Sequence, residues 1–404
     1  MKFFNVTSLE KSLEILEENF DFRLRTESVD TEDSLDRILS EDIFSTFNLP
    51  SYNRSTVDGY AINVEDSFGA SENMGTLLKM VGSVEIGKNC ERKVFRGEAM
   101  YVPTGGMIPP GCSGVVMIED TDILGEEILI NKGISQNSNL ILEGSEIKKG
   151  ELVLKKGTKL GYSHIGILSA LGVSKIEVYD RIKFYLISTG DEIIDIKETL
   201  KLGQVFDINT YALKAMIEQN MGIVVKKILV KDNLSLLEKQ IREGIQSSDI
   251  VIISGGSSVG VMDYTEKAIL ENSGKILVHG ISIKPGKPTI IAKAKEKIIL
   301  GLPGHPQSAI TVFRIILDKI LKKDNRFIIG EVGENIFGDP GKSVVINVKT
   351  EIETIEGKQF VKVYPVYSKS SMVKPLIQSD GYIVIPPHRE GVYKNESIKV
   401  WLNE

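Results

Sequence analysis

The spacing of hydrophobic residues divides this chain into helical, strand-like and mixed segments. Apolar residues at helical spacing predict amphipathic helices over residues 7–20 and 33–44, and Thr7 with Glu10 fits a capping box for the first helix. Over residues 49–137, short apolar runs lie between clusters of Gly, Pro and Asn, and helical periodicity is weak. We therefore expect a small β domain inserted at that point of the chain.

A regular alternation of strand and helix patterns begins after Arg181. The strand patterns IKFYLI, IVVKKILV and DIVIIS are followed in turn by the helical patterns TYALKAMIEQNMG, LSLLEKQIREGIQ and DYTEKAILENSG. This alternation predicts a mostly parallel sheet with helices on both faces. The ligand crevice of such a sheet lies at the carboxyl ends of its strands. After the helical pattern TVFRIILDKILKK, residues 326–404 return to β-type texture.

The patterns together predict a multidomain α/β plus β protein, because 404 residues are too many for one hydrophobic core. Two to four domains are expected for a chain of this length, and the patterns place an inserted small β domain, a central α/β domain and a C-terminal β domain in that order.

Composition narrows the function classes without changing this organisation. The chain is 42% hydrophobic and 26% charged, as is typical of a soluble globular protein. Its formal net charge of -6 argues against general nucleic-acid binding, and no apolar run approaches the length of a membrane span. The N-terminus lacks the apolar core of a signal peptide, so the expected compartment is the cytoplasm. The only cysteines, Cys90 and Cys112, form no CxxC pair and predict no zinc site.

Candidate chemistry begins at the glycine-rich turn SGGSSVG, which follows the strand pattern DIVIIS. Its glycines let the backbone approach a ligand closely, and amide groups near the start of the next helix favour an anion. Its serines add hydroxyl donors. The turn matches neither the dinucleotide fingerprint nor the P-loop, and an ordinary strand-to-helix turn is the alternative. The candidate ligand-binding residues here are Ser254, Gly255, Gly256, Ser258 and Gly260.

Acidic residues follow several of the predicted strands, at Asp191, Glu192, Asp207, Asp232 and Asp263. Carboxylates that converge beside a phosphate site suggest Mg²⁺, which binds oxygen ligands and is usually shared with substrate phosphates. Helix capping is the alternative, since an Asp cap contributes ~1 kcal/mol of stability. We expect caps to account for at least one of these residues.

Two turns framed by proline add candidate anion ligands. KPGKP places Lys284 and Lys287 on a stiff turn, which suits a phosphate or another oxyanion, although a solvated surface turn is the alternative. In GLPGHP, Pro303 and Pro306 would hold backbone amides in a fixed shape before a helix. His305 is a candidate proton carrier there, and a helix-start histidine without chemistry is the alternative.

Two further turns lie in the inserted β domain. NRSTVDGYA places Asp58 before a strand pattern, and MYVPTGGMIPPGC places Thr104 in a glycine-rich turn. Turn formation alone explains these residue types, so residue chemistry by itself does not mark either residue as catalytic.

The chain resembles the MoeA family, molybdopterin molybdenumtransferase, also seen as the E domain of gephyrin, in the stretches RSTVDGYA, PTGGMIPPGC, VVMIED, STGDEI, GQVFDIN, SGGSSVG, DYT, KPGKP and GLPGHPQSA. These stretches occur in the family's order over nearly the whole chain. The resemblance implies an elongated homodimer of four-domain subunits. The first domain would be helix-containing and elongated, and the implied boundaries, in order, are 1–48 with 138–178, 49–137, 179–325 and 326–404. In each subunit the third domain would be a MogA-like three-layer α/β domain and the fourth a β barrel. The active cleft would lie between the third domain of one subunit and the second domain of the other.

The implied reaction is insertion of molybdate into the dithiolene of adenylated molybdopterin, with release of AMP and with Mg²⁺ as cofactor. The resemblance carries site roles onto eight positions, which are Asp58, Thr104, Glu192, Asp232, Asp263, Lys284, Pro303 and Pro306. The first six are the catalytic candidates, and Glu192, Asp232 and Asp263 are the metal candidates. The implied partners are a second subunit, the pterin nucleotide and the oxyanion, with the molybdopterin adenylyltransferase as a further candidate. Neither nucleic acid nor a membrane is expected.

The chain departs from the family pattern at several positions. His305 stands where better-known members have Asn, and Gly280 stands where many members carry a basic residue. LILEGSEI lacks the family's basic residue, and SKSSMVKP keeps the C-terminal serine turn only loosely. These departures leave open a divergent paralogue that acts with tungstate.

Two other readings are also open. The first is a different nucleotide chemistry on the same α/β fold, such as adenylylation or that of the CinA-type relatives, and the two long β segments argue against it. The second is a non-catalytic scaffold or binding protein. The presence together of Asp58, Thr104, Glu192 and Lys284 argues against this second reading.

Overall fold

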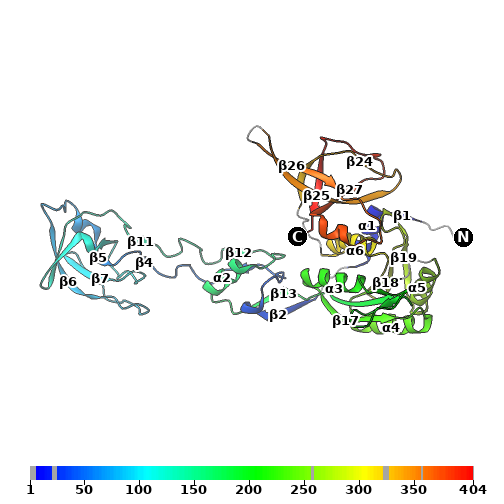
Figure 1. Cartoon of the computed structure of the whole chain (residues 1–404). Coiled ribbons are helices and arrows are strands. Elements are labelled where there is room, and N and C mark those ends of the chain that lie inside the picture. Colours follow the sequence, from blue (N-terminus) through cyan, green and yellow to red (C-terminus); the bar gives the residue numbers. More distant parts are fainter. Residues whose placement is uncertain (1–5, 21–24, 256–258, 322–326, 356–357, 404) are drawn as a thin grey trace. The chain divides into compact units, whose positions relative to one another are not determined.

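The computed structural model describes residues 6–20, 25–255, 259–321, 327–355 and 358–403. The chain forms two compact units, which are Met1–Arg25 together with Asp180–Glu404, and Thr26–Tyr179 (Figure 1). The finer division into four domains stays a prediction. Among the described helices, none is both long and apolar enough to cross a membrane.

The core of the first unit is a sheet with the strand order β17–β14–β18–β22–β21–β19. Strands β17, β14, β18 and β22 run parallel, as predicted, whereas β21 and β19 are antiparallel. Only Lys295 and Glu296 separate β21 from β22, and so short a connection requires a hairpin. The bounds are β14 Lys183–Thr189, β17 Ile223–Val230, β18 Ile250–Gly255, β19 Lys275–His279, β21 Ile290–Ala294 and β22 Lys297–Leu302.

Helices cover both faces of this sheet, as the strand-helix alternation predicts (Figure 1). Phe184 and Leu186 of β14 pack with one apolar cluster that contains residues of α1, α3 and α6. The alternate residues, Tyr185 and Ile187, pack with a second cluster that contains residues of α4 and α5. The bounds are α1 Leu9–Asn19, α3 Asn209–Gln219, α4 Leu234–Ser247, α5 Val259–Glu271 and α6 Pro306–Ile320.

The first helix is confirmed, but its predicted cap is wrong by one residue. Ser8 is the N-cap of α1, and its hydroxyl accepts a hydrogen bond from the backbone N–H of Lys11 at 3.2 Å. Thr7 instead lies with Ser8 in β1 (Thr7–Ser8), which pairs in parallel with β20 (Ile281–Lys284). Backbone pairing therefore decides which hydroxyl is placed at the cap.

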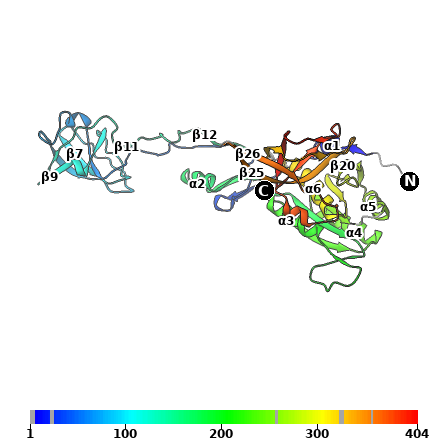
Figure 2. The same ribbon diagram turned by 45° about the horizontal axis from the view of Figure 1, so that its top comes forward.

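The C-terminal strands form a closed sheet in the order β25–β26–β23–β29–β27, because β27 also pairs with β25. This closure confirms the predicted barrel-like C-terminal part. Its interior contains Val344, Ile346 and Ile383, whereas Val345 and Tyr382 on the outer side pack into the cluster that contains α6. Helix α6 lies beside these strands in both views (Figures 1 and 2). The bounds are β23 Phe327–Val332, β24 Ile336–Phe337, β25 Ser343–Ile355, β26 Lys358–Pro365, α7 Lys374–Gln378, β27 Gly381–Ile385, β28 Gly391–Val392 and β29 Ser397–Leu402.

The second unit contains a sheet with the strand order β8–β5–β7–β6–β10–β9, within the segment where a small β domain is expected. Tyr60 and Val116 pack on one face of this sheet, and Ala61 and Val115 pack on the other. The bounds are β5 Gly59–Ile62, η2 Val64–Ser67, β6 Thr76–Ser83, β7 Glu98–Val102, β8 Gly114–Met117, η3 Ile118–Asp120, β9 Thr121–Leu124 and β10 Glu127–Ile130.

The remaining elements are short. In the second unit, antiparallel pairs join β2 to β13, β3 to β12 and β4 to β11, and α2 is the helix predicted from GYSHIGILSALG. In the first unit, β15 pairs with β16. The bounds are β2 Thr26–Asp30, η1 Thr31–Asp33, β3 Ile43–Phe44, β4 Arg54–Ser55, β11 Leu140–Ile141, β12 Leu152–Leu154, α2 Tyr162–Ala170, β13 Lys175–Tyr179, β15 Ile193–Ile194 and β16 Val205–Phe206.

The helix predicted for residues 33–44 is wrong. Asp36 has a φ of 63°, which no right-handed helix accepts, and the backbone N–H groups of Asp36 and Leu39 bond to the carbonyls of Leu160 and Thr158. Leu39 and Ile43 of this segment are buried, whereas Leu35 and Phe44 are exposed. Apolar spacing alone therefore indicated neither the backbone conformation of this segment nor the burial of all its apolar residues.

Asp249 fastens the amino ends of three neighbouring strands in the first unit. Its carboxylate accepts hydrogen bonds from the Lys183 backbone N–H at 2.9 Å, from Lys297 Nζ at 2.9 Å and from Arg25 Nη2 at 2.7 Å. Burial alone would raise the pKa of Asp249, but these donors together lower the pKa below its usual value. The buried carboxylate is therefore anionic and fully engaged.

We predict that Asp249→Asn lowers the free energy of unfolding of the first unit by about 2–3 kcal/mol at pH 7. Because the folded-state pKa is depressed, this stabilisation is present above the unfolded pKa of about 3.9 and is lost as pH falls below it. The difference between wild type and variant should therefore shrink in acid. Urea unfolding can be followed by fluorescence of Trp401, the chain's single tryptophan, which stacks on Tyr382.

Glu14→Gln is the matched control, because Glu14 forms only an exposed pair with Lys11 and its loss should change stability by less than about 0.5 kcal/mol. Equal stability of wild type and Asp249→Asn at pH 7 would contradict the assigned role.

Candidate functional site

The acidic strand ends come together in part. Strands β14 and β17 are parallel neighbours, and just beyond them the Asp232 carboxylate accepts a hydrogen bond from Thr189 Oγ1 at 2.8 Å. The backbone N–H of Asp232 donates to Asp191 Oδ1 at 3.3 Å, and the exposed Glu192 follows Asp191 directly. Among the residues whose side chains are described, no three acidic, His or Cys side chains converge. Asp263 lies in α5, and its side chain is outside the described part.

Asp207 has a capping role in this acidic group, although Ile208 holds the N-cap position of α3. Its carboxylate accepts a hydrogen bond from the backbone N–H of Thr210 at 3.1 Å and a second from the Thr210 hydroxyl. Asn209 donates from Nδ2 to Ser254 Oγ at 2.7 Å and to the Gly304 carbonyl at 2.8 Å. Through Asn209, the start of α3 is therefore hydrogen-bonded to Ser254 at the end of β18 and to Gly304 in the turn after β22. Both residues adjoin or belong to turns that are ligand-binding candidates.

The glycine turn is described only at its start. Ser254 is buried, and a Cβ atom on Gly255 would lie 2.2 Å from the Thr189 carbonyl oxygen. Glycine at 255 is therefore required by close strand packing as well as by any ligand. Gly256 and Ser258 lie outside the described residues, and Gly260 lies in the first turn of α5. The prediction that these backbone amides bind an anion stays a prediction.

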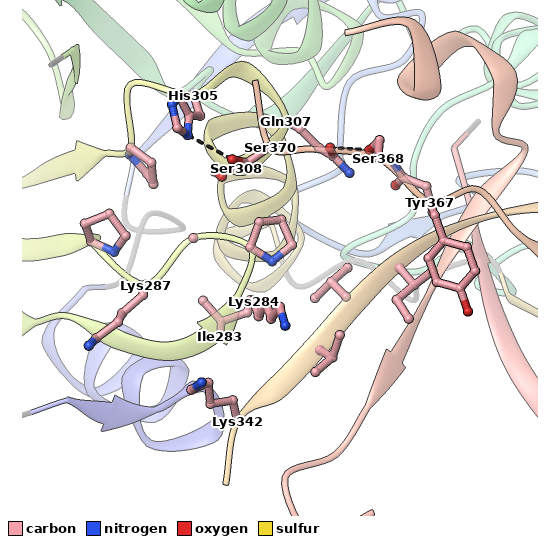
Figure 3. Close-up of a pocket in the computed structure, with 18 of the residues that line it drawn as sticks. Ile283, Lys284, Lys287, His305, Gln307, Ser308, Lys342, Tyr367, Ser368 and Ser370 are labelled. Atoms are coloured by element: carbon pink, nitrogen blue, oxygen red, sulfur yellow. Dashed lines mark hydrogen bonds between the residues drawn. The ribbon is translucent and has the colours of Figure 1, made fainter. Parts of the chain in front are cut away.

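A cavity of about 710 Å³ lies in the first unit, between the turn after β20, the start of α6 and the C-terminal strands (Figure 3). Three lysines, Lys284, Lys287 and Lys342, line the cavity together with His305. None of the described residues that line it is acidic. The first turn of a helix also carries partial positive charge and free N–H groups. The cavity therefore favours an anionic ligand.

The serine-containing turn SKSSMVKP of the C-terminal part is hydrogen-bonded to the start of α6. Ser370 Oγ and His305 Nδ1 are 2.8 Å apart, and the Gln307 backbone N–H donates to the Ser370 carbonyl at 3.2 Å (Figure 3). Ser368 Oγ donates to Gln307 Oε1 at 2.6 Å. His305 is thus a helix-start residue that also lines the cavity and has a hydroxyl partner.

One carboxylate holds two of the cavity lysines. Asp339 Oδ2 accepts from Lys284 Nζ at 3.2 Å and from Lys342 Nζ at 3.1 Å. The hydrogen bonds from Lys342 and Lys284 lower the pKa of Asp339, so this side chain is anionic at neutral pH. Lys284 remains exposed, with 62% of its side chain accessible, and an incoming anion can reach it.

The two candidate turns of the second unit meet each other. The Thr104 backbone N–H donates to Asp58 Oδ1 at 2.8 Å, and both residues are exposed. A Cβ atom on Gly59 would lie 2.0 Å from the Val116 carbonyl oxygen, so glycine after Asp58 is required by packing between β5 and β8. Asp58 therefore orders the PTGG turn, and its carboxylate stays accessible.

The structure brings some predicted residues together and not others. Around the cavity it gathers Lys284, Lys287, Pro303 and His305, and Pro306 begins α6. Glu192 and Asp232 lie at the ends of β14 and β17 and are not among the residues that line this cavity, and Asp58 and Thr104 belong to the second unit.

Sequence reasoning did not select Lys342, Ser368 or Ser370, which also line the cavity. The loose serine motif SKSSMVKP was the signal for the two serines, and no motif pointed to Lys342. At Gly280, where many family members are basic, the φ of 96° favours glycine.

Three family models match successive parts of the chain. Residues 7–172 match the MoeA N-terminal region (domain I and II), residues 185–323 match the probable molybdopterin binding domain, and residues 332–402 match the MoeA C-terminal region (domain IV).

Similar proteins agree with these matches. A putative molybdopterin biosynthesis protein of Methanocaldococcus jannaschii is 32% identical over 403 residues, which cover 97% of this chain and 95% of that protein. The molybdopterin molybdenumtransferase of Haemophilus influenzae is 33% identical over 308 residues, which cover 76% of this chain and 74% of that enzyme.

The crystal structure of the molybdopterin biosynthesis MoeA protein from Pyrococcus horikosii matches with a TM-score of 0.87 and 35% identity, over 98% of this chain and 99% of that chain. The similarity in sequence and in fold thus extends over nearly the whole length, and the chain belongs to the MoeA family.

Proposed function

We propose that this chain is a molybdopterin molybdenumtransferase, which inserts molybdate into adenylated molybdopterin and releases AMP. The observation that carries the proposal is the cavity lined by Lys284, Lys287 and Lys342, without an acidic side chain among its described lining residues. The curated relative from Haemophilus influenzae carries the same enzyme name.

The charge of the cavity fits a tetrahedral dianion such as molybdate. Each lysine ammonium offers three donors, and charge-assisted hydrogen bonds to an oxyanion are about twice as strong as neutral ones. The stiff turn that contains Pro285 and Pro288 places Lys284 and Lys287 at the cavity, and the C-terminal part contributes Lys342. The function of these lysines is to bind and orient the oxyanion while the adjacent surface receives the pterin nucleotide.

The acidic strand ends fit Mg²⁺, which commonly takes one or two protein carboxylates and completes its shell with water and substrate phosphates. Glu192 and Asp232 would hold the ion, and Asp263 is the third candidate. When bound, Mg²⁺ supplies positive charge that neutralises the phosphate oxygens. Thr189 Oγ1, at 2.8 Å from Asp232 Oδ1, fixes the orientation of that carboxylate.

We further propose that the protein acts as a homodimer in the cytoplasm. In this arrangement the exposed pair of Asp58 and Thr104 completes the cleft of the partner subunit, as the family resemblance implies. The hydrogen bond between these residues supports a pre-ordered turn that can contact a ligand without refolding.

The proposal predicts that the purified protein releases AMP from adenylated molybdopterin when Mg²⁺ and an oxyanion are supplied. Molybdate and tungstate should be tested in parallel, because both are tetrahedral dianions and the cavity geometry does not separate them. Released AMP is quantified by liquid chromatography, and a reaction without oxyanion is the blank. The absence of AMP above the blank with both oxyanions would overturn the proposed function.

Lys284→Ala and Asp232→Asn should each lower kcat/KM by roughly 10- to 100-fold, because each removes a group that acts on ligand charge. Thermal unfolding should stay within a few degrees of wild type for Lys284→Ala. Lys349→Ala is the control, since Lys349 is an exposed lysine of β25 that does not line the cavity and forms only a long ion pair of 3.9 Å with Glu351 among the described residues. Wild-type turnover in both site variants would show that the site is misplaced.

Gly286→Ala should impair activity while leaving every lysine in the chain. Gly286 has a φ of 119°, and its added Cβ atom would lie 2.2 Å from Val312 Cγ2 in α6. The KPGKP turn must then shift away from α6, which carries the lysines with it. We expect about a tenfold rise in the Kd of the oxyanion, measured by calorimetry. Unchanged affinity would mean that the position of the turn does not matter for binding.

A further inference from the structure

Asp339 is placed so that it neutralises the cationic end of the cavity. It follows β24 and Gly338, and its single oxygen Oδ2 accepts hydrogen bonds from both Lys284 and Lys342. The Asp339 side chain is 30% exposed, so the contact lies at the mouth of the lysine cluster and is reached by solvent.

The backbone fixes this carboxylate where it stands. The Lys342 N–H donates to the Asp339 carbonyl at 3.1 Å, which closes a tight turn with Gly341 at a φ of 87°. The Gly341 carbonyl then accepts from Ser282 Oγ at 2.9 Å, and Ile283 of β20 pairs with Ser343 of β25. Asp339 is thus held beside Lys284 by the ladder that supports the lysines themselves.

We propose that Asp339 is an internal counter-anion, which an incoming oxyanion dianion displaces from Lys284 and Lys342, and which thereby sets the affinity and the charge selectivity of the cavity. The identity of the oxyanion in this inference rests on the proposed function. The exchange of Asp339 for a bound anion rests on the ion pairs of Asp339 with Lys284 and Lys342.

The exchange follows from the charges involved. The ammonium groups of Lys284 and Lys342 repel each other because both carry a positive charge at close range. In the absence of a ligand, the Asp339 carboxylate offsets this repulsion. A bound dianion takes over that role, after which Asp339 is an additional negative charge a few ångströms away. A monoanion such as chloride has too little charge to compete with the tethered carboxylate. A dianion gains more from the two lysines than Asp339 does, and so the site selects by charge.

Asp339→Asn tests the exchange, because the amide keeps the size of the side chain and removes its charge. We expect the Kd for molybdate to fall about tenfold in the variant, given the repulsion of a dianion by one charge at this distance in a wet site. We also expect chloride to become a measurable competitor. Calorimetric titration of molybdate into the full-length protein, with and without added chloride at constant ionic strength, measures both effects.

Glu396→Gln is the matched control. Glu396 immediately precedes β29 and pairs with Arg389, its side chain is 37% exposed against 30% for Asp339, and it is not among the residues that line the cavity. Its replacement makes the same change in net charge, so its Kd should stay within twofold of wild type. If both variants bind molybdate more tightly by the same factor, the effect is one of net charge and the inference falls.

A second variant guards against misfolding. Asp339→Ser also removes the charge but is small and suits a turn, so tighter binding in either variant supports the exchange. Equal or weaker binding in both variants, with wild-type thermal unfolding, would show that Asp339 only positions the lysines and would overturn the inference.

The two proposals can fail separately. AMP release by the wild type with no tightening in Asp339→Asn removes the inference and leaves the function. Tightening without AMP release removes the function and leaves the exchange. No molybdate binding by wild type or variants, together with no AMP release, removes both.

Discussion

The site depends on one backbone ladder, the parallel pairing of β20 with β25. In its register Ile283 lies opposite Ser343 and Lys284 lies opposite Val344, so the strand that presents the first cavity lysine belongs to the same sheet as the C-terminal strands. Val345 and Tyr382 reinforce the ladder by packing into the apolar cluster that contains α6. If the ladder were absent, the KPGKP turn would have no opposite wall, and the cavity would be an open surface.

This ladder also creates an electrostatic cost, because it brings lysines from two distant parts of the chain together. Like charges in one site destabilise the folded state unless a counter-charge or a ligand is present. Here the same turn that delivers Lys342 also delivers Asp339. A binding site of this kind can be stable when empty and still be selective, since the resident carboxylate defines the minimum charge that a ligand must bring.

Much of the architecture follows from the sequence because it is encoded locally. β17 and β29 begin and end where the apolar runs IVVKKILV and SIKVWL do. β14 and β18 differ from their predicted segments by one or two residues at both ends, and α4 by one residue at its carboxyl end. Failures occur where long-range pairing decides. Thr7 is drawn into β1 by β20, and Asp36 and Leu39 bond to the segment near Leu160 instead of forming a helix.

The residues of the candidate site show the same difference between features encoded locally and features that depend on long-range pairing. Lys284, Lys287 and His305 could be predicted because each lies in a compact motif whose turn chemistry is visible in a few residues. Lys342 could not be predicted, since no motif near it in the chain signals a ligand, and Ser370 was indicated only loosely by the motif SKSSMVKP. They reach the cavity only through the β20–β25 ladder and through the bond between Ser370 and His305.

Asn209 shows why the role of a side chain cannot always be predicted from its own motif. Within GQVFDIN, Asn is a residue type that commonly caps helices, but here the Asp207 carboxylate accepts the capping hydrogen bond from the Thr210 backbone N–H. Released from capping, the Asn209 amide joins Ser254 at the end of β18 to the Gly304 carbonyl in the turn before α6. A shift of either turn must therefore strain a buried hydrogen bond, which costs about 1–3 kcal/mol if it is broken without a replacement. Asn209 thus ties the end of β18 to the proline-framed turn, and that turn lines the lysine cavity.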